Sequence, residues 1–171
     1  MATILVELYR HNRWANLRLL ELCAGLSEEQ LDLSAPGTYG RVRETLVHLV
    51  AAEGRYVAAL GGPQSDQSVR EGEPIPVVAT LREHAGSSGD WLIKFAEESP
   101  NGKVLTGTWR DEPYRMAAAQ LMVQAINHAT EHRAHVVSIL TQHGVDVPSL
   151  DGWTYGEATG LDRVPDEKRA S

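Results

Sequence analysis

The chain has little of several features that define whole classes of protein. Its single cysteine, Cys23, excludes an internal disulfide framework and fits a reducing compartment. No apolar run approaches the ~20 residues of a membrane-spanning helix, and the start becomes acidic at Glu7, too early for a signal peptide. Lys and Arg number 16 against 23 Asp and Glu, and the net charge of -7 disfavours a nucleic-acid partner. We therefore expect a cytoplasmic protein with neither a membrane nor a nucleic-acid partner.

The composition that remains is that of a folded globular protein. Hydrophobic residues make up 42% and charged residues 23% of 171 residues, which is enough to enclose one core. We expect a single domain over residues 1–171, with a polar tail from about residue 161.

Four segments have the apolar periodicity of long helices. The expected helices cover residues 3–24, 41–60, 78–99 and 114–143. Glycines at 25, 61 and 144 follow three of them as stop signals. In the first segment Ile4, Leu8, Leu19 and Leu22 form the expected apolar stripe. We expect the polar stretch 62–76 to form a long crossover connection and residues 103–109 to form a short extended segment. The fold class predicted is all-α, a four-helix bundle with one long crossover connection.

Histidines gather in the last of these helices. At about 100° per residue, His132 lies about 40° from His128 and His135 about 20° on its other side, so the three share one helix face. The positions above and below are apolar: Leu121, Ala125, Val136 and Ile139. Burying unpartnered imidazoles is costly, and a divalent metal ion satisfies them. The pattern predicts a metal site, with a hydrogen-bonded polar patch as the alternative.

A third ligand must come from another helix, and His48 is the candidate because it sits mid-helix among apolar residues. Glu44 and Glu53 on the same helix are either acceptors that orient a ring N–H or solvated surface charges. The zincin motif His-Glu-x-x-His is absent, because Ala129 follows the first histidine of the pair. A di-iron carboxylate bundle is also disfavoured, since no histidine has Glu three residues before it.

Three stretches, in this order, resemble the DinB/YfiT-like family of metalloenzymes. Residues 9–16 (Tyr-Arg-His-Asn-Arg-Trp-Ala-Asn) are similar to its opening, residues 44–53 to its first ligand helix, and residues 127–133 to its paired-ligand helix. Residues 153–160 resemble the ending of some members. The resemblance implies a four-helix bundle, frequent homodimers, and a metal site made by His48, His128 and His132.

The chain departs from the family where many members have Arg-Gly-Gln after the second paired ligand, because here Arg133-Ala134-His135 stands in that place. His135 is therefore open to three roles: a fourth ligand, a group that supports a ligand, or a general base.

Three protein nitrogens leave coordination positions for water or substrate, as in catalytic rather than closed structural sites. Relatives in this family include metal-dependent enzymes that use low-molecular-weight thiols. The resemblance implies a thiol S-transferase that joins such a thiol to a small electrophilic substrate, with His135 or Glu131 shuttling protons. Two alternatives stay open: a metal-dependent hydrolase and a non-catalytic metal-binding stress-response protein. The expected cofactor is one divalent ion, namely zinc, nickel, iron or manganese.

Overall fold

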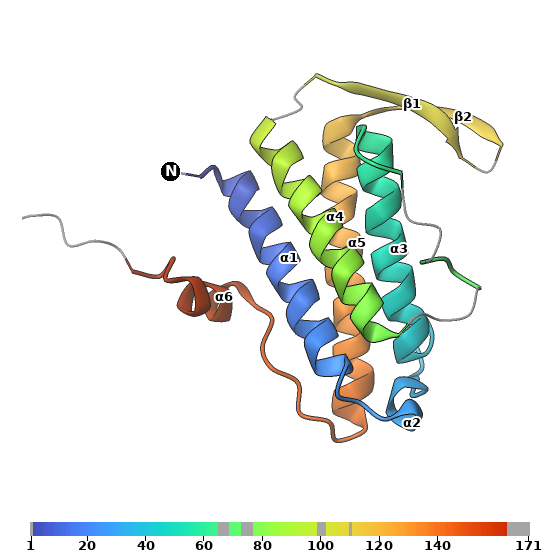
Figure 1. Cartoon of the computed structure of the whole chain (residues 1–171), viewed down its shortest axis with the longest axis vertical. Helices are drawn as coiled ribbons and strands as arrows, with labels where there is room; N and C mark the ends of the chain where they lie inside the picture. The colour runs from blue at the N-terminus through green and yellow to red at the C-terminus, as the bar shows by residue number, and fades with distance from the viewer. Residues whose placement is uncertain (1, 65–68, 73–76, 99–101, 110, 164–171) are drawn as a thin grey trace, which may run out of the picture.

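Four long helices form a bundle in the computed structural model, which describes residues 2–64, 69–72, 77–98, 102–109 and 111–163. They are α1 (Ile4–Cys23), α3 (Val42–Leu60), α4 (Val78–Glu98) and α5 (Ala118–Gln142) (Figure 1). The expected all-α four-helix bundle is confirmed. Parts of the expected crossover, residues 65–68 and 73–76, lie outside the described residues, as do the tail residues 164–171.

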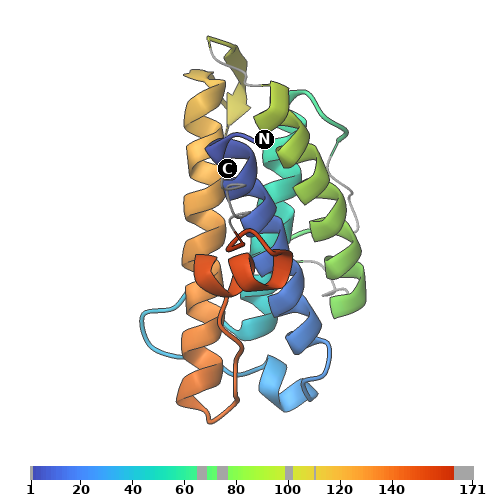
Figure 2. The same ribbon diagram turned by 90° about the vertical axis from the view of Figure 1, so that its left-hand side faces the viewer.

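Two short helices lie outside the bundle. The helix α2 (Glu28–Leu31) lies at one end, in the connection between α1 and α3. The helix α6 (Gly152–Thr159) lies across the outer side of α1, as Figure 2 shows. Its Tyr155 packs against His11 and Trp14 of α1, which fixes the C-terminal segment on the bundle. Among the described helices, none is long and apolar enough to cross a membrane.

The helix ends follow local signals in the sequence. The hydroxyl of Thr3 accepts a hydrogen bond from the Val6 amide at the start of α1. At the start of α3 the Glu44 carboxylate accepts from the Arg41 amide. At its end Gly61 adopts φ 100°, a left-handed conformation that favours glycine, and its amide donates to Ala58.

A β-hairpin corrects the expected start of the last helix. Residues 114–117 belong to strand β2 (Glu112–Ala117), which pairs antiparallel with β1 (Val104–Trp109), and Gly107 lies opposite Tyr114. In β2 the half-buried Tyr114 and Met116 alternate with exposed residues, which is the two-residue period of a strand. The helix therefore begins at Ala118 rather than at residue 114.

The expected apolar stripe of α1 is also partly wrong. Ile4 is 83% and Leu8 is 47% exposed, whereas the buried face of this helix carries Asn12 and Asn16 beside its apolar residues. In the first two turns the buried residues are Val6 and Tyr9, so the buried face is rotated away from the one that Ile4 and Leu8 indicated.

A polar layer divides the core into two apolar clusters. One cluster contains Leu19, Val50, Ala85 and Val136, and the other contains Tyr9, Val57, Leu92 and Ala125. Between these positions each helix contributes buried polar residues: Asn12 and Asn16 from α1, Glu53 from α3, Ser88 from α4, and His128, His132 and Arg133 from α5. The candidate site lies in this layer.

Candidate metal centre

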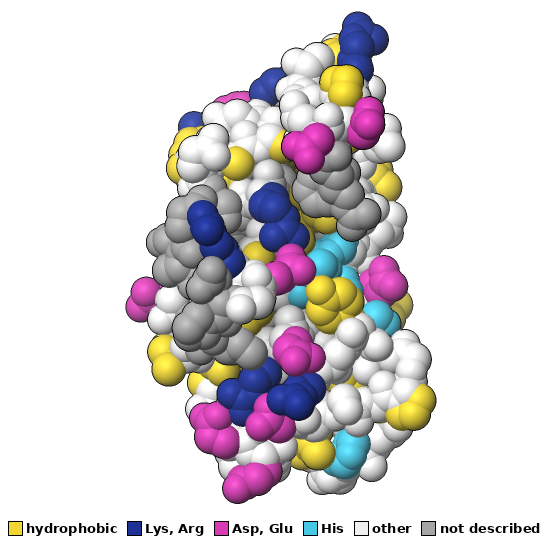
Figure 3. Space-filling view, turned by 90° about the vertical axis from the view of Figure 1, so that its right-hand side faces the viewer, with side chains coloured by type: hydrophobic (Ala, Val, Ile, Leu, Met, Phe, Trp, Pro, Cys, Tyr) yellow, Lys and Arg dark blue, Asp and Glu magenta, His cyan; other side chains and the backbone are white. Residues whose placement is uncertain are grey.

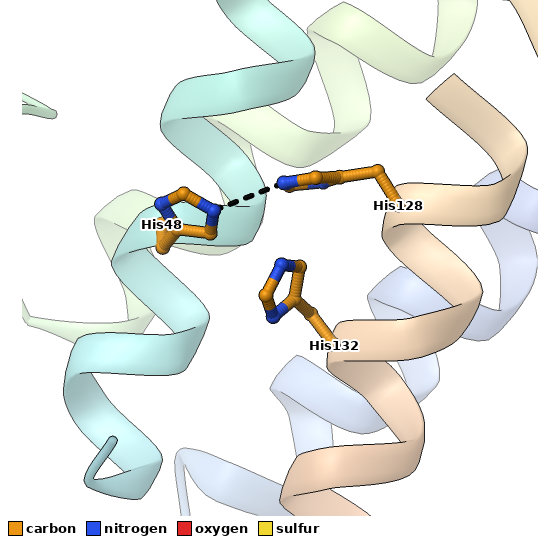
Figure 4. A group of neighbouring side chains, drawn as sticks. All are labelled: His48, His128 and His132. Carbon is orange, nitrogen blue, oxygen red and sulfur yellow. Dashed lines mark hydrogen bonds between the residues drawn. The ribbon is translucent and has the colours of Figure 1, made fainter. Parts of the chain in front are cut away.

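Three histidines meet at the interface between α3 and α5. His48 comes from α3, and His128 and His132 come from successive turns of α5 (Figure 4). One nitrogen of each lies within 4.8 Å of the others, and His48 Nε2 lies 3.0 Å from His128 Nε2. Residues four apart lie on one helix face, and α3 packs against α5 with His48 facing that pair. The structure thus brings together the three histidines that the sequence suggested as ligands.

The donor set fits a divalent ion. Zinc binds imidazole nitrogens at about 2.0–2.1 Å, which places bound nitrogens about 3–4 Å apart, and nitrogens that lie within 4.8 Å of one another reach this spacing by small side-chain rotations. In the described part of the chain, this group of ligand candidates contains no carboxylate and no thiolate. The Nδ1 atoms of His48, His128 and His132 are buried and lack a hydrogen-bond partner in the described structure.

Burial keeps the paired histidines in the form that binds metal. It lowers the pKa of His128 to about 4, and repulsion between a protonated His128 and the protonated forms of His132 and His48 adds to the shift. Burial likewise lowers the pKa of His132 to about 4, and repulsion from the protonated forms of His48 and His135 lowers it further. Both rings are therefore neutral at pH 7, and no proton has to leave them before a metal ion binds.

Aromatic rings enclose the three histidines. Tyr39 stacks on His48 with ring centroids 4.1 Å apart and an interplanar angle of 23°, and it meets His132 edge-on. The ring of Tyr56 meets that of His128 edge-on, with ring centroids 5.7 Å apart. Figure 3 shows histidine side chains at the surface between hydrophobic and charged side chains. Aromatic rings thus cover part of the centre, while the His48 side chain keeps 17% of its surface exposed to solvent.

The two residues expected to move protons occupy different environments. The His135 ring lies 5.4 Å from that of His132, and its buried Nδ1 has no hydrogen-bond partner in the described structure. Glu131 is exposed on α5, and its charge slightly opposes the lowering of the His132 pKa. Neither residue belongs to the group of three ligands.

Two other histidines serve the fold. His11 Nε2 lies 2.8 Å from the carbonyl oxygen of Leu150, and His143 Nδ1 lies 2.8 Å from that of Ile139. They fasten the segment that follows α5 and the end of that helix, away from the centre. Cys23 is fully buried and packs in the apolar core.

The structure corrects the sequence interpretation of Glu53, and it confirms the interpretation of Glu44 as a solvated surface charge. Glu53 is 0% exposed, so it is not a solvated charge, and its partners are asparagines rather than a histidine. Its Oε1 accepts hydrogen bonds from the side-chain amides of Asn12 and Asn16, each at 2.8 Å. Glu44 is exposed and accepts from the Arg41 amide instead. Neither carboxylate orients a histidine ring.

A buried arginine completes the network around Glu53. Arg133 Nη1 donates to Asn12 Oδ1 at 2.7 Å and to Asn16 Oδ1 at 2.6 Å, so the two amides bridge the guanidinium and the carboxylate. Burial raises the pKa of Glu53, and the amide of Asn12 and the charge of Arg133 act against this rise. The sequence held one signal of this burial, because the second expected helix is apolar around most of its circumference.

The carboxylate that does approach a ligand was missed. Glu71 Oε1 lies 3.1 Å from His48 Nδ1, which is within ion-pair distance but outside hydrogen-bond geometry. This residue lies in a polar connection without periodicity, so no sequence signal marked it.

Comparison with known proteins agrees with this arrangement. The sequence model of the DinB family matches residues 1–169. The chain belongs to the DinB family. The match covers α1, α3 and α5, which carry the three stretches that suggested the family, and it extends through α6. Among curated protein sequences, none matches the chain.

Proposed function

We propose that this DinB-family chain is a metal-dependent enzyme that transfers a low-molecular-weight thiol to an electrophilic small molecule. One divalent ion, zinc, nickel, iron or manganese, would be held by His48, His128 and His132. The observation that carries the proposal is the convergence of three imidazoles, two of them neutral at pH 7, in a group that includes no carboxylate and no thiolate. Such a set fills only part of the coordination sphere and leaves positions for a substrate.

In the proposed reaction, the metal ion and the side chains of the protein have different roles. A divalent ion at this centre would supply the positive charge that stabilises a thiolate at neutral pH. His135 or Glu131 takes the proton that the thiol loses, the sulfur forms a bond to carbon of the electrophile, and the leaving group departs with the electron pair and is then protonated. His135 is the better placed of the two, because its ring lies beside that of His132 and has a buried free nitrogen.

The same nitrogen of His135 supports a non-catalytic alternative. If His135 completed the coordination sphere, the protein would bind metal without offering a position to a substrate. Addition of a thiol would then leave the spectrum of the cobalt-loaded protein unchanged, whereas binding of a thiolate to the metal would add a charge-transfer band. An assay distinguishes metal-assisted hydrolysis from thiol transfer, because hydrolysis would consume the substrate at a rate that does not depend on added thiol.

The proposal includes a homodimer of single-domain chains, each spanning residues 1–171, located in the cytoplasm. An apolar groove of about 280 Å³ between the start of α1 and α5 supports the dimer. Its lining includes the exposed Leu8 and Val123, side chains that a second copy would cover. The free, buried thiol of Cys23 supports a reducing compartment.

The first experiment counts metal per chain by mass spectrometry in the untagged protein and in a His128→Ala/His132→Ala variant. We expect about one ion per chain in the wild type, and loss of that ion in the variant while circular dichroism shows that it stays folded. Absence of metal from the wild type, even after reconstitution with zinc, nickel and manganese, would refute the proposed function. Cobalt-substituted protein with candidate thiols then tests the reaction class.

A further inference from the structure

One carboxylate outside the expected site reaches the ligand that α3 supplies. Glu71 lies in the described stretch 69–72, between α3 and α4, and its Oε1 is 3.1 Å from His48 Nδ1. The other nitrogen of the same ring, Nε2, faces His128 at 3.0 Å. Glu71 and His128 therefore contact the two different nitrogens of one imidazole.

Two further contacts hold the Glu71 carboxylate beside this ring. Arg55 Nη2 lies 2.9 Å from Oε1, and the phenol of Tyr39 donates to Oε2 at 3.3 Å. The ring of Tyr39 also stacks on the His48 imidazole. The carboxylate is thus fixed by residues from α3 and from the loop before it, and Tyr39 limits rotation of the imidazole.

A histidine that binds metal through one nitrogen usually donates its other N–H to a carboxylate, a carbonyl or water, which fixes the tautomer and the orientation of the ring. We propose that Glu71 is a positioning residue for the metal centre: it accepts the Nδ1–H of His48, so that Nε2 keeps its lone pair directed toward His128 and His132. This assignment rests on the proposed metal binding. The step from the 3.1 Å contact to a hydrogen bond requires only a small rotation of the ring or the carboxylate.

The geometry singles out His48 among the three ligands. In the described part of the chain, His48 is the ligand whose Nδ1 meets a carboxylate, whereas the Nδ1 atoms of His128 and His132 are buried without a hydrogen-bond partner. His128 and His132 are held relative to each other by one helix. His48 has to be aligned with them from another helix, and it is the ligand that needs an outside restraint.

The test compares metal affinity in Glu71→Gln with that of the wild type, by competition against a chromophoric chelator for zinc and for cobalt. Glu71→Gln keeps the size of the side chain but removes its charge. We expect a loss of about 10–100-fold in affinity, the range found when such supporting carboxylates are changed. Tyr39→Phe, which keeps the stacked ring and removes the bond to Glu71, should lose less. Glu83→Gln, on the exposed side of α4, is the matched control and should bind as the wild type does.

Two further measurements distinguish positioning from other roles. Urea unfolding of the metal-free Glu71→Gln protein should have an unchanged midpoint, because Glu71 is 41% exposed. The visible spectrum of the cobalt form should keep the band intensity of the wild type, because the number of ligands stays the same. A changed intensity, which would make Glu71 itself a ligand, would overturn the assignment, and so would a fall in affinity matched by a fall in metal-free stability.

The failures of the two proposals are separable. If the wild type binds metal and Glu71→Gln binds it equally well, the positioning role is wrong and metal binding stands. If the wild type binds no metal, the proposed function fails, and the role of Glu71 fails with it.

Discussion

Replacing Arg133 by methionine should destabilise the protein strongly, because it isolates a buried charge. Arg133 is 5% exposed and donates to the Oδ1 atoms of Asn12 and Asn16, and these asparagines in turn donate to the fully buried Glu53. Methionine fills a similar volume and removes the guanidinium. The change leaves two amide oxygens without donors and one carboxylate without its compensating charge.

The magnitude follows from the cost of leaving a buried charge without its partner. Breaking a buried ion pair by removing one side costs about 3–5 kcal/mol. At roughly 2–4 °C per kcal/mol for a chain of this size, the melting temperature should fall by about 6–20 °C. Thermal and urea unfolding of the metal-free protein, followed by circular dichroism, measure this loss without any contribution from bound metal.

Two variants control the interpretation. Arg10→Met removes an exposed arginine that pairs with Glu7 and should cost no more than about 1 kcal/mol. Arg133→Met combined with Glu53→Met should lose less stability than the sum of the two single changes, because no uncompensated charge remains. An Arg133→Met protein as stable as Arg10→Met, or strict additivity in the double variant, would refute the account of this network.

Three further outcomes are expected. His128 and His132 have a folded-state pKa of about 4, below the ordinary value of about 6.5, so the unfolded chain binds more protons and the metal-free protein should lose stability as the pH falls from about 6.5 toward 4. Allowing for partial solvent access, the loss is on the order of 1–2 kcal/mol per histidine, and an equally steep pH dependence in the His128→Ala/His132→Ala variant would contradict it. Removing metal with a chelator should lower the stability by about 2.7 kcal/mol when free metal had been at 100 times its dissociation constant, and a chelator without effect would argue against binding to the folded state. Burial raises the pKa of Cys23 to about 12, so the thiol should react with an aromatic disulfide reagent only after unfolding, and rapid labelling of the native protein would show that the thiol is accessible.

The helices were largely predictable because their signals are local. Apolar periodicity and the glycine at position 61 give the end of α3, and the four-residue spacing of His128 and His132 places both on one face wherever the helix lies. The first strand of the hairpin lies within the extended segment expected at residues 103–109, but the second strand was not predictable, since Tyr114 and Met116 continue into the apolar pattern of α5 and their two-residue alternation is short.

The parts of the site that were missed depend on contacts between distant segments. Glu53 has a buried position because Asn12 and Asn16 of α1 and Arg133 of α5 surround it, and no spacing along its own helix reveals them. Glu71 lies beside His48 because of the conformation of the connection between α3 and α4, and no periodicity in the sequence predicts that conformation. Local patterns predicted the three histidines that the structure brings together, but not the positions of Glu53 and Glu71.

The polar layer limits how the helices can slide along one another. Shifting α1 by one turn, about 5.4 Å, would move either Asn12 or Asn16 into an apolar cluster and leave Glu53 with one of its two asparagine donors. The observed alignment of α1, α3 and α5 along their axes is the one that keeps Asn12 and Asn16 paired with both Glu53 and Arg133. The positions of His48 along one helix and of His128 along another are therefore set relative to each other by residues that touch neither histidine.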